Sequence, residues 1–367
     1  MWNRWGRKGR CLLGASSENR RKRLGWLDFG KAMGILVVLL VHAECSLGPA
    51  SFYGGMFYMP VFFVAAGYTY RRKEESFGVF VKKKAVRLLF PYFGTSLFLW
   101  VFFWVKDSLL TGNPTDLNLP SIFGILYSRN QMYAASYPGE NPVLMTLLNA
   151  PLWFLTAMFL TYVWYEWIRR RKNMRVWLAA GLTASVVWHY VSDLLLPWSL
   201  EAVPYFACFF AAGELLHRID RITYLTEKGN RWKGLALLIC FAALANLNGS
   251  VNLSIGDYGF SMLFYLAVGI AGSILVFLAG AYLERFCPPV MRPIETVGRQ
   301  TLVILCFHMF LFMFIRTGAG LLGLPEGVTQ ALLVIGSLVP LTAAGEVLPS
   351  VFRHISGSVR HGQSSSI

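Results

Sequence analysis

Long apolar segments alternate with shorter polar ones along the chain. A helix needs about 17–25 mostly apolar residues to cross a membrane, and ten segments have roughly this length. They are 24–45, 52–70, 88–106, 149–168, 176–196, 201–217, 232–248, 258–284, 299–316 and 327–348. The pattern predicts an all-α, polytopic integral membrane protein of about ten transmembrane helices, surrounded by the lipid bilayer and without a separate soluble domain.

Two tails flank this ten-helix domain of residues 24–348, and one long connection interrupts it. Residues 1–23 form a basic tail, and residues 349–367 form the C-terminal tail. Between the third and fourth predicted helices, residues 107–148 are polar and contain several prolines. Long loops of this kind are either functional lids or flexible connections, and the sequence fits both descriptions.

The basic residues predict which side of the membrane each connection faces. Only 14% of the residues are charged, against about 25% in soluble domains, yet the net charge is +15. Cytoplasmic loops of membrane proteins are rich in Lys and Arg. If the N-terminus is inside, only Lys106, Arg129 and Arg316 fall on the outer side, so both tails are predicted to be cytoplasmic. Topology then accounts for the positive charge, no nucleic-acid partner is expected, and a bacterial cytoplasmic membrane is the predicted location.

The first predicted helix carries Asp28, Lys31 and His42 among its ionisable side chains. Each such group at membrane depth costs about 2.5–3.5 kcal/mol on insertion scales, so a function is the first hypothesis. The spacing of Lys31 and His42 places them near one helix face, about 16 Å apart along the axis. His42 then lies in the outer half of the membrane, where an imidazole can act as a general base. A packing histidine bonded to a neighbouring helix is the alternative.

Asp28 and Lys31 have a structural alternative as well. They stand three residues apart on one face, which suits an ion pair, and Lys31 can also extend toward the inner interface. The sequence fits the structural and the functional role equally.

A second histidine at membrane depth, His308, lies nine residues after Arg299. This spacing corresponds to about 14 Å along the ninth predicted helix, close to the middle of the membrane. Histidines from two helices could line one cavity, and packing is again the alternative.

Lys84 and Arg87 belong to a basic segment directly before the third predicted helix. They could bind the phosphates of a cytosolic ligand, or simply flank the helix on its inner side. The chain has no histidine pair with metal-binding spacing and no Walker sequence, so neither a metal nor nucleotide hydrolysis is expected.

A cleavable signal peptide is another interpretation of the first segment. A basic start, an apolar stretch and the small residue Ala43 resemble one. The long basic leader and Lys31 within the apolar stretch argue against it. Cleavage after Ala43 would remove His42 and end any catalytic role for it.

Several sequence blocks occur in an order that resembles a known family. They are Trp26 to His42 (a basic residue, ten residues, then His), Pro60 to Tyr68, Lys84 to Tyr92, Pro151 to Leu155, and Gly298 to His308. Together these blocks resemble the acyltransferase-3 family of integral-membrane acyltransferases, and within it the fucose-4-O-acetylase-like branch. Lys31 and Lys84 stand where much of the family has Arg, and Lys lacks the bidentate geometry of Arg.

The resemblance implies transfer of an acyl group from cytosolic acetyl-CoA, or another acyl-CoA, to a hydroxyl of a cell-envelope glycan or lipid-linked sugar. His42 would then be the base that deprotonates the acceptor hydroxyl. His308 would orient the acceptor or polarise the thioester carbonyl.

The resemblance also implies binding residues for both substrates. Lys84 and Arg87 would meet the CoA phosphates, with Arg87 better suited. Lys31 and Asp28 would line the inner half of the donor channel, with Asp28 in contact with substrate, and Trp153 would form a wall on the acceptor side. Two alternatives remain open: a proton-coupled exporter of an envelope lipid or sugar, since buried ionisable residues also suit transport, and a catalytically silent subunit.

Overall fold

The computed structural model describes residues 24–72, 74–111, 119–139 and 150–361. Within these ranges every regular element is a helix, with only two isolated backbone bridges, Tyr133–Leu194 and Asn252–Asp257. The α-helices are α1 (Gly25–His42), α2 (Pro49–Phe57), α3 (Pro60–Thr69), α4 (Phe77–Thr111), α5 (Leu119–Tyr127), α6 (Trp153–Arg169), α7 (Met174–Val191), α8 (Val203–Arg218), α9 (Arg221–Thr226), α10 (Arg231–Asn248), α11 (Met262–Phe286), α12 (Pro288–Arg299), α13 (Thr301–Leu321) and α14 (Glu326–His361). The all-α prediction is confirmed for this part of the chain.

The predicted apolar segments coincide with helices, but not all of these helices meet the criteria for a membrane span. Five are long and apolar enough, namely α1, α4, α11, α13 and α14, and the α2–α3 pair, bent by 40°, would make a sixth. The helices α6 and α8 have only 17 and 16 residues, at the lower end of what a bilayer core of about 30 Å requires. The structure therefore supports a helical membrane protein, while ten spans and cytoplasmic termini stay predictions. The predicted basic tail 1–23 lies outside the described residues.

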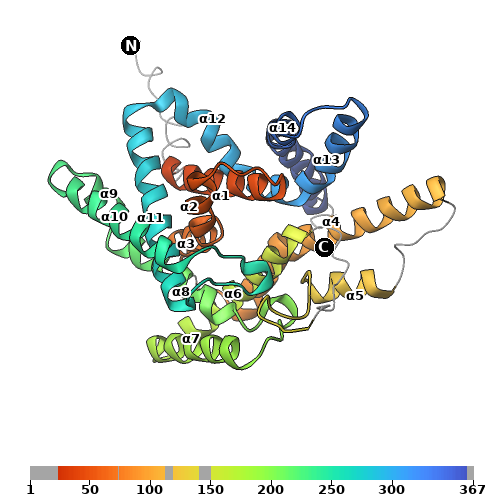
Figure 1. The fold of residues 1–367 in the computed structure, drawn as a ribbon. Coiled ribbons are helices and arrows are strands. Elements are labelled where there is room, and N and C mark those ends of the chain that lie inside the picture. Colours follow the sequence, from red (N-terminus) through yellow and green to blue (C-terminus); the bar gives the residue numbers. More distant parts are fainter. Residues whose placement is uncertain (1–23, 73, 112–118, 140–149, 362–367) are drawn as a thin grey trace, which may run out of the picture.

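Helix α1 occupies the centre of the molecule (Figure 1). It packs against α11 and α12 on one side and contacts α3 and α13, while α6 and α8 lie beyond α3. The close α3–α8 contact depends on two glycines. A Cβ on Gly67 would collide with the carbonyl of Phe210, and one on Gly213 would collide with the carbonyl of Val64. Small residues let helices in a membrane approach closely, and here they bring α8 next to α3.

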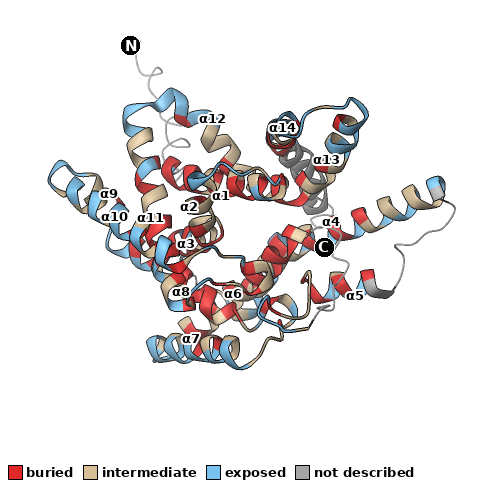
Figure 2. Cartoon of the chain, viewed as in Figure 1, coloured by how far each residue is buried: buried red, intermediate tan, exposed pale blue. Residues whose placement is uncertain are grey.

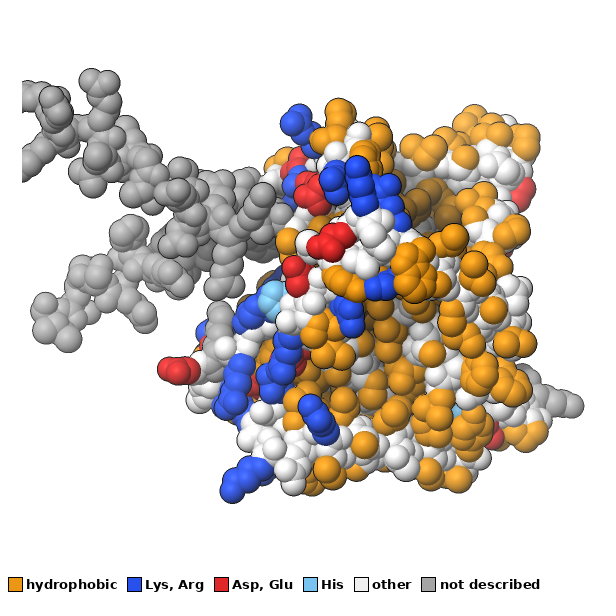
Figure 3. Space-filling view, turned by 90° about the vertical axis from the view of Figure 1, so that its left-hand side faces the viewer, with side chains coloured by type: hydrophobic (Ala, Val, Ile, Leu, Met, Phe, Trp, Pro, Cys, Tyr) orange, Lys and Arg blue, Asp and Glu red, His pale blue; other side chains and the backbone are white. Residues whose placement is uncertain are grey.

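The surface matches a chain embedded in lipid. Buried residues are concentrated in the central helices, whereas exposed residues predominate on the peripheral ones (Figure 2). Large apolar side chains such as Phe90, Leu97 and Leu109 are exposed. In Figure 3, hydrophobic side chains cover much of the visible face, and Lys and Arg gather along one edge.

Three connecting segments form a small polar layer that we call the polar cap, composed of residues 128–137, 192–202 and 249–261. Backbone hydrogen bonds join them: the Ala134 N–H donates to the Asp193 carbonyl (2.7 Å), and the Ala135 N–H donates to the Ile255 carbonyl (2.9 Å). All three segments are predicted to be on the outer side. The first belongs to the predicted loop 107–148, of which residues 112–118 and 140–148 lie outside the described part of the chain.

Candidate active site

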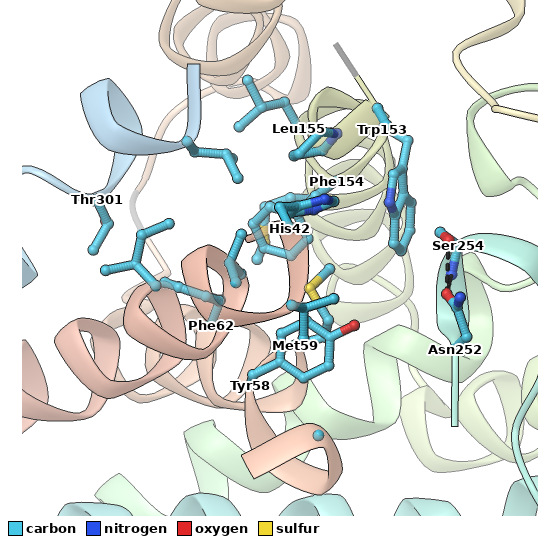
Figure 4. Close-up of a pocket in the computed structure, with 18 of the residues that line it drawn as sticks. His42, Tyr58, Met59, Phe62, Trp153, Phe154, Leu155, Asn252, Ser254 and Thr301 are labelled. Atoms are coloured by element: carbon cyan, nitrogen blue, oxygen red, sulfur yellow. Dashed lines mark hydrogen bonds between the residues drawn. The ribbon is translucent and has the colours of Figure 1, made fainter. Parts of the chain in front are cut away.

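A cavity of about 400 Å³ lies between α1, the α2–α3 pair, α6 and the start of α13 (Figure 4). Its walls are mainly apolar, with Ile35, Phe62 and Phe154 among them. Polar side chains line parts of it. Arg87 comes from the first third of α4, Ser51 and Thr301 come from α2 and α13, and Asn130, Ser250, Asn252 and Ser254 belong to the polar cap. The cavity thus adjoins both the basic segment near the start of α4 and the polar cap.

His42 is the last residue of α1 and lines this cavity. The helix ends here because Glu44, two residues later, has a left-handed backbone (φ 56°), which is incompatible with a continued helix. In Figure 4 the imidazole points across the cavity toward Trp153. Among the described residues none gives the His42 ring a hydrogen bond, so its nitrogens are available to a substrate.

His308 lies directly behind His42. It is fully buried in α13, and the centres of the two imidazole rings are 5.4 Å apart. Nδ1 is 2.9 Å from the carbonyl oxygen of Ile304 and 3.2 Å from that of Leu305. Because carbonyl oxygens only accept, Nδ1 carries a proton and the neutral ring keeps its lone pair on Nε2. That Nε2 is buried and has no hydrogen-bond partner within the described structure.

The two predicted histidines are thus brought together, but in different positions. His42 lines the cavity, whereas His308 is shielded from it by the surrounding side chains. His308 can therefore affect a bound substrate through His42 rather than by direct contact.

Arg87 and Lys84 also differ in position. Arg87 is exposed and lines the cavity. The Lys84 ammonium lies 3.5 Å from the ring centre of Tyr162, itself a cavity residue, and 5.4 Å from that of Phe80. These cation–π contacts hold Lys84 beside the cavity wall, and the guanidinium of Arg87 is the more accessible cation.

Asp28 and Lys31 pair with each other. Lys31 Nζ is 2.5 Å from Asp28 Oδ1, and neither side chain lines the cavity. Asp28 is buried against α12, where a Cβ on Gly298 would collide with the Asp28 carbonyl. This geometry favours the structural alternative that the sequence left open.

Trp153 lies on the cavity wall nearest the polar cap, at the start of α6. The guanidinium carbon of Arg129 is 5.9 Å from its ring centre. Arg129 is only 2% exposed, forms an ion pair with Glu201, and donates to the Ser254 carbonyl (3.3 Å). Sequence reasoning placed Arg129 on the outer side and did not single out Glu201. No local signal identifies them, because their burial arises only where two segments of the polar cap meet.

The arrangement suits proton transfer in a largely apolar pocket next to a basic segment. Within the described residues, no group of three His, Cys, Asp or Glu side chains could hold a metal ion. What the site offers instead is an accessible imidazole, a buried partner imidazole, and an arginine facing the same cavity.

Comparison with known proteins gives one match. A family model described as an acyltransferase domain, acyltransferase-3, matches residues 24–348. No curated protein and no solved structure gives a match. The matched region contains the whole cavity and both histidines.

Proposed function

Because this chain belongs to the acyltransferase-3 family, we propose that it is a membrane O-acyltransferase that moves an acetyl or similar acyl group from cytosolic acyl-CoA to a hydroxyl of a cell-envelope sugar. The observation that carries the proposal is the position of His42. Its ring faces an apolar cavity that Arg87 borders from the basic segment and Asn252 borders from the polar cap. A charged donor and a polyhydroxylated acceptor would reach His42 from these two regions.

In the proposed reaction, His42 accepts the proton of the acceptor hydroxyl while that oxygen attacks the thioester carbonyl. The C–S bond then breaks, and the CoA thiolate takes the proton from His42, so that no net proton is gained or lost. Positioned proton transfer of this kind contributes typically about 10²–10⁴-fold to the rate. The apolar walls would keep water out and so limit hydrolysis of the thioester.

His308 is proposed as a positioning residue. Its fixed tautomer leaves a lone pair on Nε2 beside the His42 ring. Such an acceptor would favour the protonated form of His42 that arises during the reaction. This role replaces direct contact of His308 with the substrate.

Arg87 is the proposed contact for the CoA phosphates, because an arginine fork matches phosphate oxygens. Lys84 would contribute charge from beside Tyr162. Trp153 would form the wall on the acceptor side. The sequence resemblance is the basis for proposing an acetyl donor and a fucose-like acceptor. The charge pattern is the basis for proposing a bacterial cytoplasmic membrane. Within the described part of the chain, no structural feature favours the alternative of a proton-coupled exporter.

The test is thiol release from acetyl-CoA by the purified protein, with and without crude envelope glycan. The wild type is expected to release thiol only when glycan is present, and His42→Ala to lose about 10²–10⁴-fold in rate while purifying as a folded protein. His217→Ala is the matched control, since His217 lines no part of the cavity. Wild-type turnover by a well-folded His42→Ala protein would overturn the role of His42.

A further inference from the structure

A second cavity, of about 440 Å³, lies between the polar cap and the end of α7. Side chains with hydrogen-bonding groups line it: Ser136, His189, Ser192, Asp193, Asp257 and Tyr258. Its polar lining contrasts with the apolar walls around His42. The proposed mechanism does not use this cavity.

Two carboxylates that line this cavity each accept a hydrogen bond on only one of their two oxygens. Asp193 Oδ1 accepts a hydrogen bond from the Ser136 hydroxyl (2.5 Å), and Asp257 Oδ1 accepts one from the Gly259 N–H (2.9 Å). In the described structure, the second oxygen of each carboxylate has no protein donor. Both therefore offer acceptor positions to a ligand that carries hydroxyl donors.

The remaining side chains of the cavity limit which kinds of ligand it could bind. The His189 ring packs edge-on against Tyr258, with ring centres 5.0 Å apart, and no described residue hydrogen-bonds to its nitrogens. It can donate to or accept from a hydroxyl. Two carboxylates in one cavity disfavour an anionic ligand, and among the described residues no three His, Cys, Asp or Glu side chains are placed to hold a metal ion. A neutral polyol, such as a sugar, satisfies all of these groups.

One chain segment, residues 252–257, contributes to the walls of both cavities. Asn252 and Ser254 of this segment line the cavity of His42, whereas Gly256 and Asp257 line the second one. Gly256 has a left-handed backbone (φ 72°), and a Cβ there would press on Leu195 and Ala134. The segment is thus tightly packed, and it links the second cavity to the one that contains His42.

We propose that the second cavity is an acceptor subsite, which binds neutral sugar units of a glycan chain remote from the unit that is acylated. This inference rests on the proposed function, because it assigns the acceptor of that same reaction. Binding at Asp193 and Asp257 would position another hydroxyl of the chain at His42. The acceptor is then a neutral oligosaccharide or polysaccharide rather than a single sugar or an anionic polymer.

The experiment measures direct binding of envelope glycan, fractionated into neutral and anionic pools, to the purified full-length protein without acyl-CoA. The wild type is expected to bind the neutral pool. Asp193→Asn and Asp257→Asn should each weaken binding about tenfold or more, as expected for loss of hydrogen bonds to a charged group. Glu326→Gln, an exposed acidic residue outside the cavity, is the matched control and should bind as the wild type does.

A further variant controls for the possibility that the Asp variants lose binding because they misfold. Ser136 is exposed, so Ser136→Trp should fill the cavity without disturbing the packing beneath it and should also abolish binding. Preference for the anionic pool, or unchanged binding by all three variants, would overturn the subsite.

Thiol release by the same proteins, measured separately with acetyl-CoA, distinguishes this inference from the proposed function. Asp-dependent glycan binding without any thiol release would leave the glycan-binding site standing and reject the acyltransferase. If thiol release depended on His42 while glycan binding did not depend on Asp193 or Asp257, the acyltransferase would stand and the subsite would be rejected.

Discussion

The imidazole rings of His42 and His308 lie 5.4 Å apart, at the end of α1 and in the interior of α13. Only His42 faces the cavity, and Nδ1 of His308 is committed to backbone carbonyls of its own helix. The pair therefore consists of one reactive group and one group that supports it.

This relationship predicts that the two histidines act as a unit. His308→Ala should lower kcat by about ten- to a hundredfold, while the KM for acyl-CoA changes little. Because His308 acts through His42, the double variant His42→Ala/His308→Ala should be no slower than His42→Ala alone, as expected for groups that work together. Initial rates of thiol release for the four proteins measure this. Fully multiplicative losses would show that His308 acts independently of His42.

The different positions of Arg87 and Lys84 predict different effects of their removal. Arg87→Ala should raise the KM for acyl-CoA about tenfold or more, because a phosphate contact of an accessible guanidinium is lost. Lys84→Ala should have a smaller effect, since Lys84 is held over the Tyr162 ring. Acyl-CoA titrations of the two variants test this, with Arg87→Lys as the conservative comparison. Equal KM values for all forms would indicate that these residues only flank the helix.

Gly55 offers a way to alter the cavity without disturbing the fold. It lines the cavity, and a Cβ added there meets no atom within 4 Å. Gly55→Leu should therefore fold normally and lower kcat/KM, more strongly for longer acyl groups than for acetyl. Thiol release measured with acetyl-, butyryl- and hexanoyl-CoA checks this expectation.

Gly67→Leu is the contrasting variant. Its added side chain would collide with the backbone of α8 at Phe210, and loss of folded protein is expected because overpacked interfaces are destabilised. For Gly55→Leu, an unchanged preference for acyl-chain length would contradict the prediction. It would mean that the acyl donor does not pass through this cavity.

Membrane topology can be tested at two exposed positions, Ser136 in the polar cap and Lys172 between α6 and α7. The ten-span prediction places them on opposite sides of the membrane. In a background without the six native cysteines, a membrane-impermeant maleimide applied to intact cells should label Ser136→Cys but not Lys172→Cys. Labelling of both would mean that α6 does not cross the membrane, in line with a smaller number of spans.

The sequence by itself determined that the chain is a helical membrane protein. It also identified the ionisable residues that are most suited to chemistry at membrane depth. Hydropathy is a local property, so the ten apolar segments identified most of the helices without reference to their packing. The shorter helices α5, α9 and α12 fall in predicted connections and were not predicted. The cost of ionisable groups in an apolar medium singled out His42 and His308. A further local departure is the bend between α2 and α3, which follows from Pro60, since proline cannot donate the backbone hydrogen bond that a continuous helix needs.

Only the tertiary structure decided which of these residues share a site. Helix packing joined His42 to His308, left the Asp28–Lys31 pair away from the cavity, and placed Arg87 rather than Lys84 on its wall. It also buried Arg129 against Glu201 and formed the second cavity around Asp193 and Asp257. Contacts between segments distant in the chain depend on how helices and loops pack against one another, and side-chain volume and close backbone approach at residues such as Gly67 set that packing. No periodicity or motif within a single segment predicts which distant residues this packing brings together.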